Sequence, residues 1–206
     1  MYAQEYTREE VVGGYQRIVD KELIEDITYS KNSLLDDYKR LNGFSAALEY
    51  NIRSWIGIVG EFGYGRTSPV LHYNIEFAAF PKSRTEYRRS QTSFLFGPRL
   101  SYRRGRFRVF GHALLGGNCV DRGFTHTITY ADGSEDVNKS NQRYTGVATA
   151  FGGGLDVSLG KSISIRPVQL DLLTTYRSYD THHRDYNQNQ FRYFGGIAFK
   201  VGAVKR

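Results

Sequence analysis

The side chains best suited to acid–base or metal chemistry gather in one segment, TTYRSYDTHHRDY, at residues 174–186. Within it a hydroxyl, two carboxylates and two imidazoles stand close together: Ser178, Asp180, His182, His183 and Asp185. Such groups form a hydrolytic site when a base reaches the nucleophile and a third group orients that base, or a metal site at suitable spacings. No strict metal motif is present, and polar residues at this density are typical of a solvated loop. We therefore predict neither a catalytic residue nor a bound metal here.

A further histidine, His112, lies inside an alternating stretch, FGHALLGG, on the same side as Arg108. An imidazole in this position is interpreted as a hydrogen-bonded member of a buried ion network and not as a general base. The glycine-rich segments VGGYQ and FGGGLD do not form phosphate-binding loops, because no helix follows them and no Lys-Ser/Thr completes the motif. The sequence therefore predicts no cofactor.

The elements that position these residues are β-strands, because large apolar residues alternate with small or polar ones along most of the chain. No segment has helical periodicity. The alternation predicts eight strands: 10–19, 42–51, 56–65, 92–102, 107–118, two within 150–176 that meet at Gly160 and Lys161, and 191–201. We expect these strands to form one domain over 10–202, with an N-terminal extension, 1–9, and a C-terminal tail, 203–206.

The connections between the predicted strands alternate in length. Tight turns of about three or four residues are interspersed with long polar connections at 20–40, 66–89, 119–145 and 178–189. One end of the sheet therefore has only short turns, and the other end carries the long loops. This asymmetry is typical of outer-membrane barrels, which have short periplasmic turns and long outer loops. The predicted fold is all-β: an eight-stranded antiparallel up-and-down transmembrane β-barrel.

The face of the strands that carries small residues is predicted to line the lumen. It holds mostly Gly, Ala and Ser with isolated charges, and only one lysine, Lys200, falls within a strand, which does not suit a water-facing surface. An eight-stranded barrel is just wide enough for its own side chains, so we expect Gly152 and Gly154 to make room and the buried charges to pair. The predicted lumen network consists of Glu49, Glu61, Arg99, Arg108, His112, Asp156, Arg166, Gln169, Asp171 and Arg192.

The opposite face, which carries the large apolar residues, is predicted to contact lipid. Its members are Phe44, Leu48, Tyr50, Ile56, Ile58, Phe62, Phe94, Phe96, Leu100, Phe151, Leu155, Val157, Leu170, Phe191, Tyr193, Ile197 and Phe199. Pro167 lacks a donor for the ladder and is interpreted as a β-bulge, which accounts for a change of parity between Ile165 and Val168. An aromatic girdle at the membrane interface is expected near the short turns, from Trp55, Tyr102 and Phe107.

The chain is basic, with 28 Lys and Arg against 21 Asp and Glu and a net charge of +7, which suggests an anionic neighbour. Because guanidinium binds phosphate bidentately, arginines in or beside the predicted outer loops are candidates for lipopolysaccharide contact: Arg84, Arg88, Arg89, Arg122, Arg143 and Arg184. Nucleic-acid binding is not predicted, because these charges are spread among loops and do not form one basic face. The single cysteine, Cys119, forms no internal disulfide.

A helical membrane protein is excluded by the mean hydropathy of −0.50 and by the lack of any run near the roughly 20 apolar residues that a membrane helix needs. The first residues, MYAQEYTREE, lack the basic start and apolar core of a secretion signal. An outer-membrane location therefore implies a signal peptide that has been removed.

A resemblance to a known family is carried by five segments: VVGGYQRI, SFLFGPRLSYR, FGHALLGG, AFGGGLDVSLGKSISIRPVQLD and FGGIAFKVG. They resemble the small outer-membrane β-barrel domain family related to the barrel of outer membrane protein A, over about Val11 to Gly202. The resemblance implies a Gram-negative outer-membrane protein, and many members have no assigned activity. The final strand is similar to the signal read by the barrel assembly machinery, through Gly196, Phe199 and Val201, although Phe194 stands where a polar residue is usual.

Together these features predict a non-enzymatic integral outer-membrane barrel with a structural or surface-interaction role. Its loops are expected to contact lipopolysaccharide or an external partner, and its lumen is expected to be closed by the ion-pair network. Two alternatives remain. A lipid-modifying barrel enzyme would use His112 or His182, and the weak site geometry argues against it. A soluble lipocalin-like carrier of small molecules would have an apolar lumen, and the lysine distribution argues against it.

Overall fold

The computed structural model describes residues 6–20, 40–68, 70–73, 82–130, 132–177 and 186–205. Most of them lie in strands, which follow in chain order: β1 (Tyr6–Asp20), β2 (Arg40–Asn51), β3 (Ile56–Thr67), β4 (Val70–Tyr73), β5 (Lys82–Arg104), β6 (Phe107–Thr129), β7 (Glu135–Ser158), β8 (Ile163–Arg177) and β9 (Tyr186–Lys205). No helix in these residues is long and apolar enough to cross a membrane.

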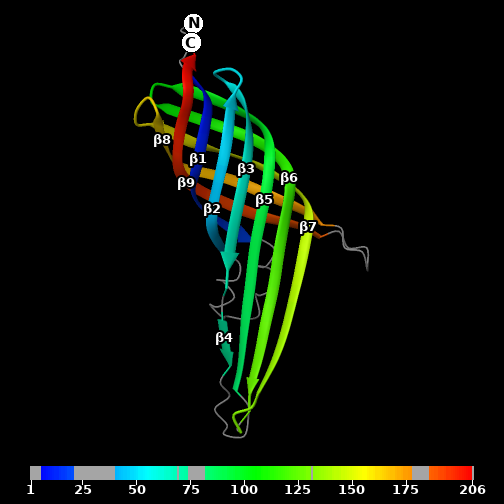
Figure 1. Cartoon of the computed structure of the whole chain (residues 1–206). Helices are drawn as coiled ribbons and strands as arrows, with labels where there is room; N and C mark the ends of the chain where they lie inside the picture. Colours follow the sequence, from blue (N-terminus) through cyan, green and yellow to red (C-terminus); the bar gives the residue numbers. More distant parts are fainter. Residues whose placement is uncertain are drawn as a thin grey trace.

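The strands form one closed ring. Each strand pairs antiparallel with its neighbours in the order β3-β2-β1-β9-β8-β7-β6-β5, and β3 then pairs with β5 from Ile56↔Leu100 to Thr67↔Arg89. The short β4 pairs with the far part of β5, beyond the end of β3, so β3 and β4 occupy one place in the ring (Figure 1). The prediction of an eight-stranded antiparallel up-and-down barrel is confirmed.

Tight turns close one end of the barrel. They connect β2 to β3, β5 to β6 and β7 to β8, and both chain termini lie at this same end (Figure 1). Gly105, in the turn between β5 and β6, has a φ of 59°, a conformation that side chains with a Cβ adopt at a cost. Of the long loops predicted at 20–40 and 178–189, residues 21–39 and 178–185 lie outside the described residues, whereas residues 186–189 belong to β9.

At the opposite end β5, β6 and β7, with the short β4 beside β5, continue well beyond the rest of the barrel (Figure 1). The β6–β7 ladder runs without a break from Phe107↔Val157 to Thr129↔Glu135, and β5 pairs with β6 as far as Lys82↔Thr129. We call the parts at 82–89, 119–129 and 135–145 the outer extension. The prediction of loops at 119–145 and at 82–89 was wrong, because both faces of these strands are polar and their alternation lacks the apolar contrast that marks a strand.

The tip of the outer extension is a tight turn between Tyr130 and Ser134. Gly133 adopts a φ of 82° there, and Ser134 donates from its backbone N–H and its hydroxyl to the Asp132 carboxylate at 2.9 and 2.6 Å. These hydrogen bonds from Ser134, first the hydroxyl and then the backbone, lower the pKa of Asp132 below its usual value. The turn is therefore fixed by its own polar groups.

The sheet also extends past the predicted domain boundaries at the other end. Tyr6 and Thr7 of β1 pair with Lys205 and Val204 of β9, so part of the predicted extension 1–9 and of the tail 203–206 belongs to paired strands. These strand ends were not predicted because their side chains are polar and do not alternate with apolar ones.

The distribution of side chains is inverted relative to a water-soluble protein. The residues predicted to face lipid all lie on the outer face, where they are exposed or half-exposed, and Leu48, Phe96 and Tyr102 reach 66%, 63% and 68% exposure. Charged residues fill the interior. The predicted bulge at Pro167 is confirmed by a register shift between Arg166 and Gln169, which keeps both of these side chains in the lumen.

Apolar residues share the lumen with the charges, which the sequence argument did not predict. The buried apolar cluster consists of Val12, Ala47, Val59, Leu95, Leu114, Ala148, Ala150, Leu173, Phe194 and Ala198. On β6, Leu114 lies between His112, nearer the tight turns, and Asn118, nearer the outer extension. The inward position of Leu114 was not predicted because Leu115 follows it directly, and alternation alone does not show which of the two leucines faces the lumen.

Candidate functional site

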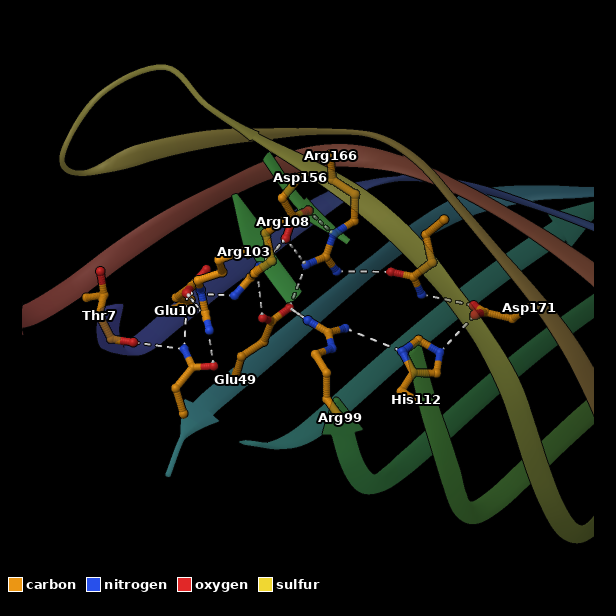
Figure 2. Close-up of polar contacts among 12 residues, drawn as sticks. Thr7, Glu10, Glu49, Arg99, Arg103, Arg108, His112, Asp156, Arg166 and Asp171 are labelled. Carbon is orange, nitrogen blue, oxygen red and sulfur yellow. Dashed lines mark hydrogen bonds and ion pairs between the residues drawn. The ribbon is translucent and has the colours of Figure 1, made fainter. Parts of the chain in front are cut away.

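The centre of the lumen network is Glu49 of β2, which faces three arginines from three other strands (Figure 2). Arg166 donates to Glu49 Oε1 at 2.7 Å and Arg108 donates to Glu49 Oε2 at 3.1 Å. Arg99 forms a third, close ion pair with the same carboxylate. All four residues are at most 6% exposed, so this carboxylate links β2 with β5, β6 and β8 across the barrel.

Two more carboxylates complete this half of the network. Asp156 accepts from Arg108 Nε at 2.8 Å and from Arg166 Nε at 2.7 Å. Glu10 accepts from Arg108 Nη1 at 2.8 Å, and Arg103 lies 3.8 Å from the same oxygen. The sequence argument missed Glu10 because it stands at the end of the predicted strand, although its parity matches that of Val12.

The other half of the network is built around Asp171. Its carboxylate accepts from Arg192 Nη2 at 2.7 Å, from Gln169 Nε2 at 2.9 Å and contacts His112 Nε2 at 2.8 Å. Arg192 also pairs with Glu61 across the lumen. Gln169 accepts from Arg166 Nη1 at 3.0 Å, and it therefore joins the two halves.

Both ring nitrogens of His112 have polar neighbours. Nδ1 lies 3.4 Å from Arg99 Nη2, and Nε2 lies 2.8 Å from Asp171 Oδ1. His112 thus links Arg99 to Asp171 in the lumen.

An aromatic ring contacts two of the arginines. The guanidinium carbons of Arg99 and Arg166 are 4.0 and 4.3 Å from the centroid of Phe110, within the range of a cation–π contact. Phe110 is 4% exposed and was not predicted to enter the lumen. Its ring therefore gives two buried guanidinium groups a favourable contact in addition to their carboxylates.

The network is balanced in charge. Its carboxylates are Glu10, Glu49, Glu61, Asp156 and Asp171, and its arginines are Arg99, Arg103, Arg108, Arg166 and Arg192. Each carboxylate faces at least one arginine, and no group of three or more His, Cys, Asp or Glu in the described part of the chain is placed to hold a metal ion. The arrangement therefore pairs charges that come from strands far apart in the sequence. The second candidate, Ser178 with Asp180, His182, His183 and Asp185, lies outside the described residues.

A separate polar group occupies the lumen near the outer extension, and it corrects one prediction. Arg89, predicted to contact lipopolysaccharide, is fully buried and donates to Asp20 at 2.8 Å. Its neighbours in the lumen, Gln91 and Gln190, exchange hydrogen bonds of 2.8 and 3.0 Å. Arg89 points inward because β5 continues through it and alternate residues of a strand face opposite sides.

The remaining predicted arginines differ in their surroundings. Arg84 and Arg88 are exposed on β5, and Arg143 is exposed on β7, where it pairs with Asp121 at 2.5 Å. Arg122 is half-buried, with its guanidinium carbon 5.8 Å from the centroid of Tyr144. Arg184 lies outside the described residues.

A group of outward arginines forms a second candidate site, which we call the outer basic cluster: Arg17, Arg40, Arg66, Arg88 and Arg143. Strand pairing brings Arg17 opposite Asn42 and Asn42 opposite Arg66, and the row continues through Ser90 and Asp121 to Arg143. Arg66, Arg88 and Arg143 line a polar cavity of about 540 Å³. Arg40 and Arg66 were missed because they lie just outside the predicted strands 42–51 and 56–65, and Arg17 was missed because it lies inside the predicted strand 10–19 and not in a loop.

The predicted girdle and the two apolar residues of the predicted assembly signal lie on the outer face of the barrel, whereas Gly196 of that signal lies on the inner face. Trp55, Tyr102 and Phe107 are 51%, 68% and 56% exposed at the end with the tight turns. Phe199 and Val201 of β9 also point outward. Cys119 is half-buried on β6, opposite Thr92 and Thr145.

Comparison with known proteins gives likenesses among solved structures. No protein-family model and no curated protein matches the chain. The attachment invasion locus protein Ail of Yersinia pestis is 16% identical over 97% of this chain and 99% of its own, with a TM-score of 0.44. The outer membrane protein OprG of Pseudomonas aeruginosa is 11% identical over 98% and 99%, with a TM-score of 0.47. Neisserial surface protein A is 10% identical over 94% and 96%, with a TM-score of 0.37. The barrel assignment itself rests on the strand pairing of this chain.

Proposed function

We propose that the chain is a non-enzymatic, integral outer-membrane β-barrel of a Gram-negative bacterium, with a structural or surface-interaction role. The observation that carries this proposal is the inverted distribution of side chains. Arg99, Arg166 and Arg192 are at most 2% exposed inside the ring, whereas large apolar residues cover its outside. A continuous apolar exterior of this size is unstable in water, and a closed ring leaves no strand edge unpaired in hydrocarbon.

Refolding tests the membrane location directly. The chain, diluted from urea into detergent micelles, is expected to become β-rich by circular dichroism and to migrate differently on a denaturing gel when unboiled. In plain buffer it is expected to aggregate, because its apolar exterior has no partner there. A β-rich, soluble monomer in plain buffer would contradict the proposal and would favour the lipocalin-like carrier.

We also propose that the lumen is closed. The ion network and the buried apolar cluster occupy the interior between the tight turns and the polar group of Asp20, Arg89, Gln91 and Gln190. An eight-stranded ring is only wide enough for its own side chains. Purified protein in planar bilayers is therefore expected to show no conductance of porin size. Steady, porin-sized single-channel steps would show that the network opens and would refute this part of the proposal.

The outer basic cluster is the part that supports contact with lipopolysaccharide. Tyr15, Phe44 and Tyr64 lie two residues nearer the barrel centre than Arg17, Asn42 and Arg66 on the same strands. Aromatic residues of this kind mark the level at which hydrocarbon meets the polar headgroups. The arginines beyond them are thus at the level of phosphate groups of the outer leaflet, and among the described residues Arg66 forms no ion pair that would compete.

Charge removal at this cluster tests the contact. The triple variant Arg17→Gln, Arg66→Gln, Arg88→Gln is expected to bind lipopolysaccharide micelles about 100-fold more weakly at low salt, at about 1 kcal/mol for each arginine near an anionic surface. The matched control, Arg53→Gln, Arg104→Gln, Arg106→Gln, removes the same charge from exposed positions at the tight-turn end. Equal binding by the two triple variants would refute the proposed contact.

The outer extension supports a role toward an external partner as the second candidate. β7 pairs with β8 only from Val147 onward, so within the described residues its part at 135–146 pairs with β6 alone. A strand edge of this kind can accept an extended segment of another protein. A biotinylated copy of the intact barrel that captures no surface protein of a host cell or a neighbouring bacterium would count against this role.

The pairing of the charged side chains in the lumen argues against the enzymatic alternative. Both nitrogens of His112 are engaged and each network carboxylate faces an arginine. A general base requires a free lone pair within reach of a substrate proton. Unchanged masses of lipid A after expression of the protein are therefore the expected result, and a mass shift lost on substitution of His112 or His182 would favour a lipid-modifying enzyme.

A further inference from the structure

The outer face of the barrel contains an apolar groove of about 650 Å³. It crosses β1, β2, β3, β5 and β6, and its outward-facing residues are Val11, Ala46, Leu48, Gly60, Phe62, Phe94, Phe96 and Gly117. Its lining exposes almost no polar atoms. The groove therefore suits an apolar occupant of elongated or branched shape and not a sugar or a phosphate.

The groove includes two glycines at positions where the fold does not require a glycine. A Cβ added to Gly60 or to Gly117 would meet no atom within 4 Å, and neither residue has a positive φ. Gly60 lies directly opposite Leu48 on one side and Phe96 on the other, and Gly117 lies opposite Phe94. Larger apolar side chains are thus accommodated all around these positions, and the two missing side chains leave a hollow there.

Two residues that line the groove, Phe62 and Phe94, belong to a ladder of aromatic rings that continues outside it through Phe44 and Tyr64. The centroids of Phe62 and Phe94 are 4.9 Å apart, those of Phe44 and Phe62 are 5.8 Å apart, and those of Phe44 and Tyr64 are also 5.8 Å apart. Rings in mutual contact hold one another in place. The two rings that line the groove are therefore held in place, and an occupant does not have to order them.

The same strands that form the groove carry the outer basic cluster farther out. Arg17 is six residues beyond Val11 on β1, Arg66 is four beyond Phe62 on β3, and Arg88 precedes Phe94 by six on β5. At about 3.3 Å for each residue of a strand, the arginines lie roughly 13–20 Å along the strands from the groove. Acyl chains extend from a phosphorylated headgroup into hydrocarbon in this same direction.

We propose that the groove holds an acyl chain of the lipopolysaccharide molecule whose phosphates contact the outer basic cluster. This inference rests on the proposed contact with lipopolysaccharide and adds a second point of recognition to it. The arginines select the anionic headgroup by charge, and the groove selects a lipid that presents an acyl chain beneath it. The barrel then binds one outer-leaflet lipid at a defined place and does not merely attract a layer of anionic lipids.

The test fills the groove and leaves the arginines unchanged. In the double variant Gly60→Leu, Gly117→Leu, the leucines occupy the hollow, whereas Gly111→Leu is the matched control. Gly111 also faces outward, lies outside the groove, and its added Cβ would meet only the Gly152 carbonyl oxygen, at an ordinary 3.7 Å. Each refolded protein is titrated in detergent with fully acylated lipopolysaccharide and with a chemically deacylated form that keeps its phosphates.

Wild type and Gly111→Leu are expected to bind the acylated form about tenfold more tightly than the deacylated form, because a filled hollow gains dispersion contacts that detergent supplies less well. The Gly60→Leu, Gly117→Leu variant is expected to lose this preference and to keep its affinity for the deacylated form. If it does not refold, Ala46→Leu fills the same groove from β2 and serves in its place.

The outcomes separate the two proposals. A groove-filled variant that still prefers the acylated lipid by the same factor overturns the groove inference, while the arginine triple variant tests the headgroup contact independently. If that triple variant also binds normally, the lipopolysaccharide contact itself is wrong. Weaker binding of the groove-filled variant to both lipid forms would indicate a disturbed surface and not a lost acyl contact, and it would also overturn the inference.

Discussion

Replacing Glu49 with alanine is expected to lower the free energy of unfolding of the barrel by about 3–5 kcal/mol, the cost of leaving buried charges without their partner. Glu49 faces Arg99, Arg108 and Arg166 at once, and no other carboxylate touches Arg99 among the described residues. Its removal leaves guanidinium groups close together in the lumen with their mutual repulsion uncompensated. The effect is measured by urea titration in detergent micelles, followed on unboiled denaturing gels.

The exposed pair of Asp121 and Arg143 supplies the control. These side chains are 43% and 72% exposed, so Asp121→Ala is expected to cost less than about 1 kcal/mol. Glu49→Gln keeps an acceptor but not the charge and is expected to fall between the two, which also gives a measurable value if Glu49→Ala does not fold. An effect of Glu49→Ala no larger than that of Asp121→Ala would mean that the network does not stabilise the barrel.

The second large effect is expected from Gly152→Ala. The added Cβ would overlap the carboxylate of Asp171 and the backbone carbonyl of Leu170, and the backbone cannot move aside without breaking the β7–β8 ladder. Overpacking of this kind costs about 1–3 kcal/mol and sometimes more. Because Asp171 must shift, the hydrogen bonds from His112 and Arg192 weaken at the same time.

Gly13→Ala is the matched control for this substitution. Gly13 also lies within a strand, but its Cβ would point outward and meet no atom within 4 Å, so its unfolding free energy is expected to change by less than about 0.5 kcal/mol. Urea midpoints of the two variants, compared with wild type in the same micelles, measure the difference. Equal midpoints for Gly152→Ala and Gly13→Ala would show that the lumen is not closely packed there.

The barrel follows from the sequence wherever one face of a strand is apolar. Alternation indicated the order of the strands, and the interruption at Pro167 gave the correct parity for Arg166 and Gln169 on either side of the bulge. Alternation does not predict a strand when both of its faces are polar. The sequence therefore predicts loops in place of the polar strands of the outer extension, and it assigns Arg89 to the surface although Arg89 pairs with Asp20 inside the barrel.

The composition of the lumen was predictable only in part. Charges on the strand face that carries small residues had to pair inside the lumen, so an ion network was expected. Which carboxylate meets which arginine depends on the tilt and stagger of strands that are far apart in the sequence. Arg192 meets Glu61 from 131 positions away. Phe110 and Leu114 were missed for a different reason, since inward and outward positions both carry large apolar residues in this barrel, and size alone does not distinguish them.

The unbroken β6–β7 ladder has a mechanical consequence. A pull on the tip at Tyr130–Ser134 along the strand axis is carried by covalent backbone into β6 and β7, and the adjoining ladders with β5 and β8 then bear the load in shear. In shear many hydrogen bonds share the force together, whereas peeling breaks them one at a time. The tip is thus connected to the closed part of the barrel by two long paired strands, which act as a stiff tether.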